Sequence, residues 1–203
     1  MREFILYSKK GLTSPSFNLD DLPGSGGRMD LVARCVISAL WMSRQMRRDS
    51  KIYLNLNGPP DPPLTLCFDG ERLRKVSPDG RNVATWIQKV LKKRYTFDEN
   101  EWNEVKNGIY LSNRSFQDLI KDRKDRKFYV LHEKGEDIRE IGIEDNPVFV
   151  LGDHIGLPKT EKKFVKRFDM KKISLGSESY FSSQSITLVQ NELDRRSQFS
   201  NNF

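Results

Sequence analysis

Two short apolar runs near the C-terminus, each followed by small residues, decide the fold. The first reads Pro147-Val148-Phe149-Val150-Leu151-Gly152-Asp153-His154-Ile155-Gly156, and the second reads Lys172-Ile173-Ser174-Leu175-Gly176-Ser177. Such runs are typical of central strands in a sheet that is covered on both faces. Ligands of open α/β sheets bind beyond the carboxyl ends of these strands, where glycine lets the backbone approach a ligand closely. The sequence therefore predicts a small-molecule site built largely from main chain. The alternative is a pair of tight connections without a ligand.

Strand and helix patterns alternate along the rest of the chain. Apolar runs predict further strands over residues 3–8, 53–56, 64–68 and 128–131, the middle two of which we expect to pair. Helical spacing predicts helices from Asp30 to about Arg48, from Ser77 onward, over 115–122, over 159–168 and from about Ser182. Asp30 is the expected N-cap of the first helix, and Ser77, followed by Pro78, is that of the second.

The remaining segments are less regular. Residues 95–113 show no clear pattern, with 98–101 expected to be solvated, and the polar end from Arg195 is expected to be frayed. Strand–helix alternation without a repeat or a low-complexity linker predicts one α/β domain over residues 1–203, with a polar tail from about 197 to 203.

Composition narrows the class of protein. The chain has 203 residues, of which 36% are hydrophobic, so it can form a core. Met1 to Ser8 include an acid and too short an apolar run for a signal peptide, and no run approaches the roughly 18 residues of a membrane helix. We therefore expect a cytoplasmic protein with no membrane partner.

Cysteine and histidine are scarce. The chain contains Cys35, Cys67, His132 and His154 and no other residue of either type. These four cannot assemble a zinc cluster at ligand spacing, so no metal site is expected. The two cysteines lie in apolar patterns, which predicts buried reduced thiols.

The positive charge is concentrated in one segment. The net charge is +7, and residues 71–94 contain eight Lys or Arg against Glu71 and Asp79 alone. Such a concentration attracts a polyanion, with nucleic acid the first candidate, although a solvated helix face would carry the same pattern. The tract 121–127 alternates in sign, which indicates a solvated helix end.

Familiar catalytic and nucleotide motifs are missing. Gly24-Ser25-Gly26-Gly27 does not continue as G-x-G-x-x-G, because position 29 is Met29, and no clear strand precedes it. It is a flexible turn or an RNA-facing loop aided by Arg28. No G-x-S-x-G accompanies His132 or His154, so a serine hydrolase is not indicated.

Four segments carry a resemblance to a known family. They are Leu22-Pro23-Gly24-Ser25-Gly26-Gly27-Arg28-Met29-Asp30, Lys75-Val76-Ser77-Pro78-Asp79-Gly80-Arg81-Asn82, residues 147–156 and Ile173-Ser174-Leu175. In order and spacing they resemble the archaeal tRNA pseudouridine-54 N1-methyltransferases of the SPOUT (trefoil-knotted) superfamily, over almost the whole chain. The resemblance implies a single SPOUT-type domain with a mostly parallel sheet, a C-terminal trefoil knot and a homodimer.

The resemblance also implies the activity. It is S-adenosylmethionine-dependent N1-methylation of pseudouridine 54 in the T-arm of tRNA, which gives 1-methylpseudouridine. The alternatives are a ribosomal RNA pseudouridine N1-methyltransferase and a non-catalytic RNA-binding module. By the family pattern the cofactor would be held by Leu131, Gly152, Leu175, Gly176, Ser177, Glu178, Ser179, Tyr180 and Ser185. Ser185 stands where many members carry cysteine. A side chain added at Gly152 would occupy the space of the cofactor.

The reaction calls for a proton acceptor and for RNA contacts. Asp79 is the first candidate for the general base, and Arg81 would steady negative charge on the target base or bind a phosphate. The alternative is that Asp79 only holds free amides at a helix start. Asp153 is a second acid, and His154 would orient a ribose or pack structurally. The expected RNA contacts are Arg28, Arg81, Lys89, Lys92 and Lys93.

Overall fold

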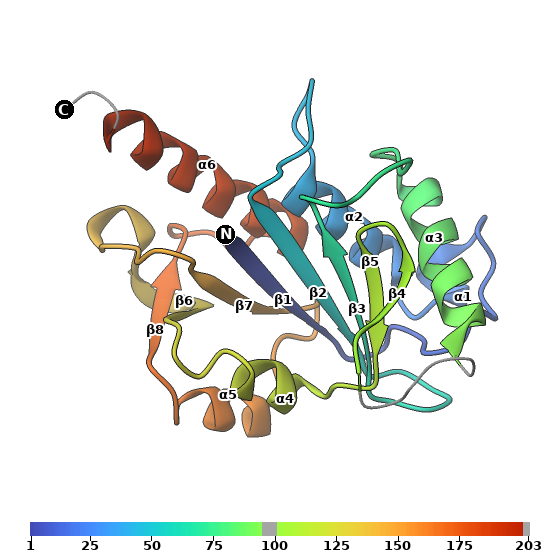
Figure 1. The fold of residues 1–203 in the computed structure, drawn as a ribbon. Helices are drawn as coiled ribbons and strands as arrows, with labels where there is room; N and C mark the ends of the chain where they lie inside the picture. The colour runs from blue at the N-terminus through green and yellow to red at the C-terminus, as the bar shows by residue number, and fades with distance from the viewer. Residues whose placement is uncertain (95–100, 201–203) are drawn as a thin grey trace.

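The computed structural model describes residues 1–94 and 101–200. Within them the chain forms an eight-stranded sheet (Figure 1). Its strands are β1 Arg2–Ser8, β2 Ser50–Leu56, β3 Leu64–Asp69, β4 Asn103–Lys106, β5 Ile109–Ser112, β6 Phe128–Asp137, β7 Val148–Gly152 and β8 Met170–Ser174. The strand order is β4-β5-β3-β2-β1-β7-β6-β8. The strands from β2 to β8 in this order pair in parallel, whereas β3, β5 and β4 pair antiparallel. The predicted α/β class with a mostly parallel sheet is confirmed, as is the pairing of β2 with β3.

Helices cover the two faces of the sheet. They are α1 Leu22–Ser25, α2 Met29–Leu40, α3 Gly80–Lys92, α4 Phe116–Lys121, α5 Lys159–Val165 and α6 Ser182–Ser200. Figure 1 shows α2 and α6 on one side of the sheet and α4 and α5 on the other. In β1, Phe4 and Leu6 join the core beneath α2, α3 and α6, whereas Ile5 joins the core beneath α4 and α5. Side chains of a strand point alternately to opposite faces, so this one segment contributes to both cores.

The two apolar runs of the sequence differ in their place in the sheet. β7 lies between β1 and β6 and is almost wholly buried, as expected of a central strand. β8 pairs with β6 alone and forms an edge of the sheet, so the prediction of a second central strand is wrong. Lys171 and Lys172 lie within β8. Lysine is one of the residues that keeps an exposed sheet edge from pairing with another chain.

The N-caps of two helices differ from the prediction. The N-cap of α2 is Arg28, two residues before the predicted Asp30, and it adopts a left-handed conformation with φ of 69°. Asp30 lies inside the first turn, where it pairs with Arg28. α3 starts after Asp79, whose side chain accepts a hydrogen bond from the backbone N–H of Asn82, so Ser77 is not the cap. In both cases the local sequence marked the helix start to within about two residues.

The end of α2 was also predicted wrongly. The helix ends at Leu40 instead of continuing to Arg48. Trp41 is extended and forms an isolated antiparallel bridge with Met46, and the N–H of Arg47 donates to the carbonyl of Leu40 at 2.7 Å. A tight reversal therefore replaces the last two predicted turns and leads directly into β2.

Two further segments complete the description. β4 and β5 lie within the region that showed no sequence pattern, and the expectation for residues 98–100 lies outside the described residues. α6 continues to Ser200 and residues 201–203 are not described, so the frayed end expected from Arg195 stays a prediction. None of the helices in the described ranges is long and apolar enough to cross a membrane.

Candidate active site

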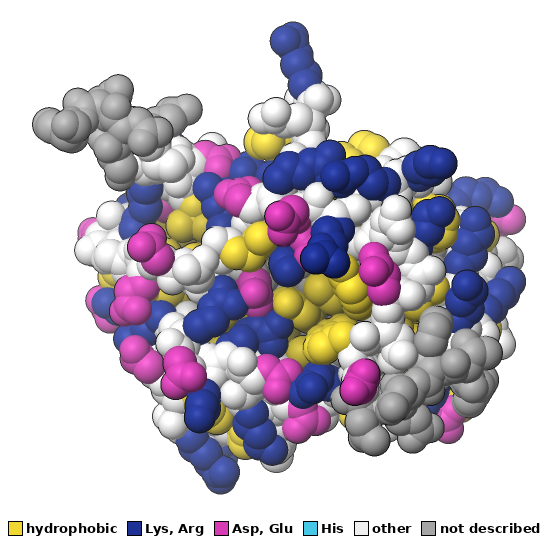
Figure 2. Space-filling model, in the orientation of Figure 1, with side chains coloured by type: hydrophobic (Ala, Val, Ile, Leu, Met, Phe, Trp, Pro, Cys, Tyr) yellow, Lys and Arg dark blue, Asp and Glu magenta, His cyan; other side chains and the backbone are white. Residues whose placement is uncertain are grey.

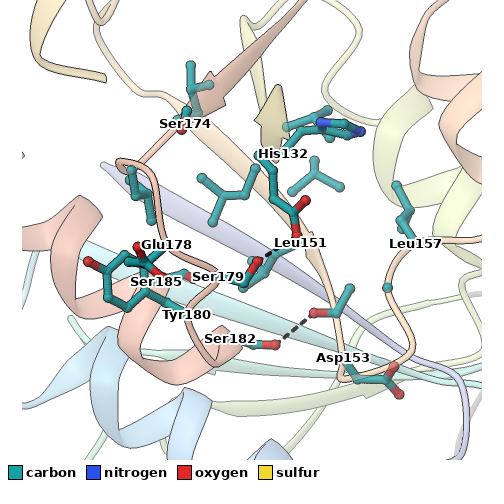
Figure 3. A pocket seen from close by; sticks show the side chains of 18 of the residues that line it. His132, Leu151, Asp153, Leu157, Ser174, Glu178, Ser179, Tyr180, Ser182 and Ser185 are labelled. Atoms are coloured by element: carbon teal, nitrogen blue, oxygen red, sulfur yellow. Dashed lines mark hydrogen bonds between the residues drawn. The ribbon is translucent and has the colours of Figure 1, made fainter. Parts of the chain in front are cut away.

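A cavity of about 380 Å³ lies at the carboxyl ends of β7 and β8, beside the middle of β6 (Figure 3). Its walls come from residues 130–133 within β6, where the pairing of β6 with β7 ends at Val130, and from 150–153 and 156–157 at the end of β7. Residues 173–176, 178–180, Ser182 and Ser185, around the end of β8 and the start of α6, form the rest. Lys162 of α5 completes the lining. Parallel strands end at the same edge of a sheet, so segments far apart in the sequence meet here.

The cavity gathers most of the residues expected to hold a cofactor. Eight of the nine line it, namely Leu131, Gly152, Leu175, Gly176, Glu178, Ser179, Tyr180 and Ser185. The ninth, Ser177, is exposed and outside the lining, with its hydroxyl 3.4 Å from the Glu178 carboxylate. A cavity therefore lies at the strand ends where the sequence predicts a small-molecule site. The contacts of these residues to a cofactor stay a prediction.

Glycine has two different roles around the cavity. A Cβ on Gly152 would lie 2.3 Å from the carbonyl carbon of Gly156 and 2.4 Å from the N of Leu157. Its first contact is therefore with the loop of its own chain, which differs from the expectation that it would fill the space of the cofactor. Gly156 and Gly176 have positive φ of 81° and 128°, and an added Cβ would meet nothing within 4 Å. The open space beside these two lining residues allows a ligand to approach the backbone.

Hydroxyl groups shape the loop before α6. The Ser182 hydroxyl donates to the Gly152 carbonyl at 2.9 Å, and the Ser179 hydroxyl donates to Glu133 at 2.6 Å (Figure 3). The Ser174 hydroxyl donates to the Gly176 carbonyl and accepts from the Gly176 N–H. The bonds of Ser179 and Ser182 attach this loop to β6 and to the end of β7, and those of Ser174 fix the turn at Gly176. Aliphatic walls, main chain and a few polar groups together suit a nucleoside-type cofactor.

The acid expected near this loop has a structural role. Asp153 is buried, and its carboxylate accepts from the backbone N–H of Lys9 at 2.8 Å and of Ile155 at 2.9 Å. It therefore joins the end of β1 to the loop after β7. His154 is exposed, lies outside the cavity lining, and has its Nδ1 4.0 Å from the Asp153 carboxylate.

His132 is a lining residue that the sequence did not single out (Figure 3). Burial, followed by the charges of Lys172 and Lys162, holds the pKa of His132 below its usual value. Its Nδ1 accepts the backbone N–H of Lys134 at 3.0 Å, so in the neutral ring the proton is on Nε2. His132 directly follows Leu131, the last residue of a predicted strand. That position is the sequence feature that could have marked His132 as a site residue.

The candidate catalytic pair lies outside the cavity lining. Asp79 is exposed and caps α3, with its carboxylate 2.8 Å from the Asn82 N–H. This hydrogen bond is the one expected if Asp79 holds free amides at the start of the helix. Arg81 of α3 pairs with Asp20 at 2.5 Å, and both side chains are more than half exposed. Within one chain, neither Asp79 nor Arg81 faces the cavity.

The expected RNA contacts also lie outside the lining. Arg28 is held by Asp30 through two hydrogen bonds, of 2.9 and 3.1 Å. Lys89, Lys92 and Lys93 are exposed on α3 and its C-cap, and the Lys89 ammonium lies 4.5 Å from the centre of the Trp86 ring. Figure 2 shows Lys and Arg side chains along the right edge of the molecule, where α3 lies.

Both thiols are buried and free, as predicted. Burial raises the pKa of Cys67 to about 12 and also raises that of Cys35, so neither is a reactive thiolate near neutral pH. Within residues 1–94 and 101–200, no three His, Cys, Asp or Glu side chains are grouped so that they could hold a metal ion.

Comparison with known proteins gives the family. A family model described as "Putative SAM-dependent RNA methyltransferase" matches residues 1–198. The chain is 42% identical over 201 residues to a tRNA (pseudouridine(54)-N(1))-methyltransferase of Methanocaldococcus jannaschii, covering 97% of this chain and 98% of that protein. It is also 42% identical over 196 residues to the protein of the same name from Methanocella arvoryzae, covering 97% and 100%.

A solved structure supports the fold. Archaeoglobus fulgidus Nep1 bound to S-adenosylhomocysteine has a TM-score of 0.68 and 14% sequence identity, and the match covers 96% of this chain and 97% of that one. The SPOUT-type α/β fold implied by the resemblance is thus confirmed, and its C-terminal knot stays a prediction. With a model match over nearly all of its length and full-length relatives at 42% identity, the chain belongs to this family of SAM-dependent RNA methyltransferases.

Proposed function

We propose that this chain transfers the methyl group of S-adenosylmethionine to N1 of pseudouridine 54 in the T-arm of tRNA, giving 1-methylpseudouridine. The names of the relatives support the reaction. The observation that carries the proposal is the cavity beside β6 at the ends of β7 and β8, which gathers eight of the nine residues that the family pattern assigns to the cofactor.

The residues present fit such a cofactor. Val130, Leu151 and Leu175 offer apolar surface for an adenine, and the open backbone at Gly156 and Gly176 offers amide and carbonyl groups. When bound, S-adenosylmethionine supplies an electrophilic methyl group on a sulfonium, which becomes a neutral thioether on transfer. The chain holds the reactants in line, and such positioning is worth up to roughly 7–11 kcal/mol of the barrier.

The nucleobase supplies the nucleophile. Pseudouridine is joined to ribose through carbon, so its N1 carries a proton that the N1 of uridine lacks. Transfer forms the N1–methyl bond as the sulfur–methyl bond breaks, and the N1 proton passes to a base or to water. Asp79 and Arg81 lie outside the cavity lining, so they take part only where the RNA or a second subunit brings α3 to the cavity.

We propose a homodimer on the basis of exposed apolar side chains near the cavity. Ile155, Tyr180, Phe181 and Leu188 come from the loop after β7, the loop before α6 and α6 itself, and Phe181 is 66% exposed. Exposed apolar residues grouped in this way are typical of a protein interface.

A methyl-transfer assay tests the activity. The protein is incubated with radiolabelled S-adenosylmethionine and T-arm RNA that carries either pseudouridine or uridine at position 54, and with a ribosomal RNA fragment that contains pseudouridine. We expect label only in the pseudouridine T-arm, recovered as 1-methylpseudouridine by nucleoside mass spectrometry. Label in uridine-54 RNA would contradict the mechanism, and label in the ribosomal fragment alone would favour the ribosomal alternative.

A further inference from the structure

Helix α5 and its C-cap, Lys166, carry four lysines on one face. Lys159, Lys162, Lys163 and Lys166 recur at i, i+3, i+4 and i+7, the spacing that places side chains along a single stripe. All four are exposed, and the buried residue of the helix, Val165, belongs to the core on the other side. We refer to these four side chains as the α5 lysine stripe.

No acid neutralises the α5 lysine stripe. Within the described residues, no ion pair involves any of its four members. Glu161 is the single acid of the helix, and one of its carboxylate oxygens is buried. Burial is the largest cause of the raised pKa of Tyr7 on β1, and the negative charge of Glu161 is the second. Glu161 therefore faces the sheet. Like charges three and four residues apart destabilise a helix, and Lys159 adds a cation at its N-terminal end.

The stripe adjoins the candidate active site. Lys162 lines the cavity, and α5 directly follows Gly156 and Leu157, which also line it. Lys172 on β8 is exposed. Its positive charge and that of Lys162 both lower the pKa of His132 in the cavity wall. The mouth of the cavity is therefore positively charged on this side. In Figure 2, Lys and Arg side chains project from the lower left of the molecule, where α4 and α5 lie.

We infer that the α5 lysine stripe binds the phosphates of the substrate RNA that flank the nucleotide entering the cavity. Lysine ammonium groups neutralise phosphates and release their counterions, so a row of four unpaired cations suits a polyanion strand. The inference rests on the proposed function and deepens it. It assigns the contacts nearest the reacting base to α5, whereas the sequence had drawn attention to α3, whose Lys89 stacks on Trp86.

Two matched double variants test the assignment. K163Q/K166Q removes two cations of the stripe that do not line the cavity, and K89Q/K92Q removes two from α3. The affinity for pseudouridine-54 T-arm RNA is measured at several salt concentrations with S-adenosylhomocysteine present. We expect the stripe variant to bind about tenfold more weakly and to lose about 1.5 from the slope of log affinity against log salt. The α3 variant should lose less of both.

Control measurements keep the result interpretable. Circular dichroism and the affinity for S-adenosylhomocysteine alone should be unchanged in both variants, since the substituted residues lie outside the cavity lining. Wild-type affinity and salt dependence in K163Q/K166Q would overturn the inference, as would a greater loss in K89Q/K92Q. The RNA-binding readout needs no turnover. A wild-type protein that binds through α5 but methylates no pseudouridine would overturn the proposed function and leave the surface assignment standing.

Discussion

At the residue scale, the absence of a side chain at position 152 brings two segments of the chain together. The carbonyl carbon of Gly156 and the N of Leu157 lie where a Cβ at 152 would lie, within 2.4 Å of it. Contacts under 3.0 Å to backbone cannot be relieved by turning a side chain, so any larger residue must displace the loop. Because the same loop lines the cavity, the glycine shapes the site indirectly.

Substitution of Gly152 tests this indirect role. We expect Gly152→Ala to weaken S-adenosylhomocysteine binding at least about tenfold, or about 1.4 kcal/mol, because the loop at 156–157 must move. Isothermal titration calorimetry on the folded variant measures it. Gly142→Ala is the matched control, since an added Cβ there meets nothing within 4 Å, and it should bind normally. Unchanged affinity in Gly152→Ala would show that this loop does not shape the cofactor site.

A second residue prediction separates two roles of Asp79. Its hydrogen bond to the Asn82 N–H indicates a helix cap, so Asp79→Ala should lower the free energy of unfolding by about 1 kcal/mol. Asp79→Asn should keep most of that stability, because asparagine also caps helices. If Asp79 is only a cap, Asp79→Asn should also keep the methyl-transfer rate. A fall of about a hundredfold or more in kcat, with stability retained, would identify it as the base.

At the element scale, a buried ion pair connects β1 to the segment after α4. The Glu3 carboxylate lies 2.5 Å from Arg123 Nε and 2.6 Å from Arg126 Nη1, and the side chains of Glu3 and Arg123 are each 10% exposed. Arg123 also stacks over the Tyr53 ring at 4.1 Å. Burial raises the pKa of Glu3, but the charges and hydrogen bonds of Arg123 and Arg126 outweigh it, so the net pKa lies below the ordinary 4.5.

This pair predicts a dependence of stability on pH. A lowered folded pKa contributes stability above pH 4.5 that is lost as the pH falls through the folded value. Glu3→Gln leaves Arg123 buried without its partner, so we expect it to lower the free energy of unfolding by about 3 kcal/mol at pH 7.

The deficit of Glu3→Gln should shrink steadily below pH 4.5. Urea denaturation at a series of pH values measures it. Asp169→Asn removes a partner of Lys127 whose side chain is 65% exposed, and it should change stability little. A pH-independent deficit in Glu3→Gln would contradict the electrostatic role of this pair.

For several strands and helices, the local sequence pattern was sufficient to predict their position. Period-two and apolar runs placed β1, β2, β3, β6 and β7, and α4 begins at a capping box formed by Ser115 and Asp118. β4 and β5 showed no pattern because they are short. The reversal at Trp41 was missed because its bridge to Met46 interrupts an apolar series that continues at helical spacing.

At the scale of the whole molecule, the cavity and the exposed apolar residues near it predict how two copies assemble. Light scattering on the purified protein should give twice the mass of one chain. Phe181→Asp with Leu188→Asp places charge on the proposed interface and should give the mass of a single chain. Ser16→Asp with Asn107→Asp adds the same charge at other exposed positions and should stay dimeric. A wild-type protein with the mass of one chain would overturn the homodimer.

The family pattern assigned the eight residues of the cavity wall. Local pattern alone was enough for the α/β class and for the small-residue loops that follow β7 and β8. Each of these depends on residues close together in the chain, because strand and helix periods and small-residue loops are properties of short segments. Two features depended on long-range packing. They are the edge position of β8 and the nearness of α5, not α3, to the cavity. Strand order and helix placement follow from which surfaces bury one another, and no short segment contains that information.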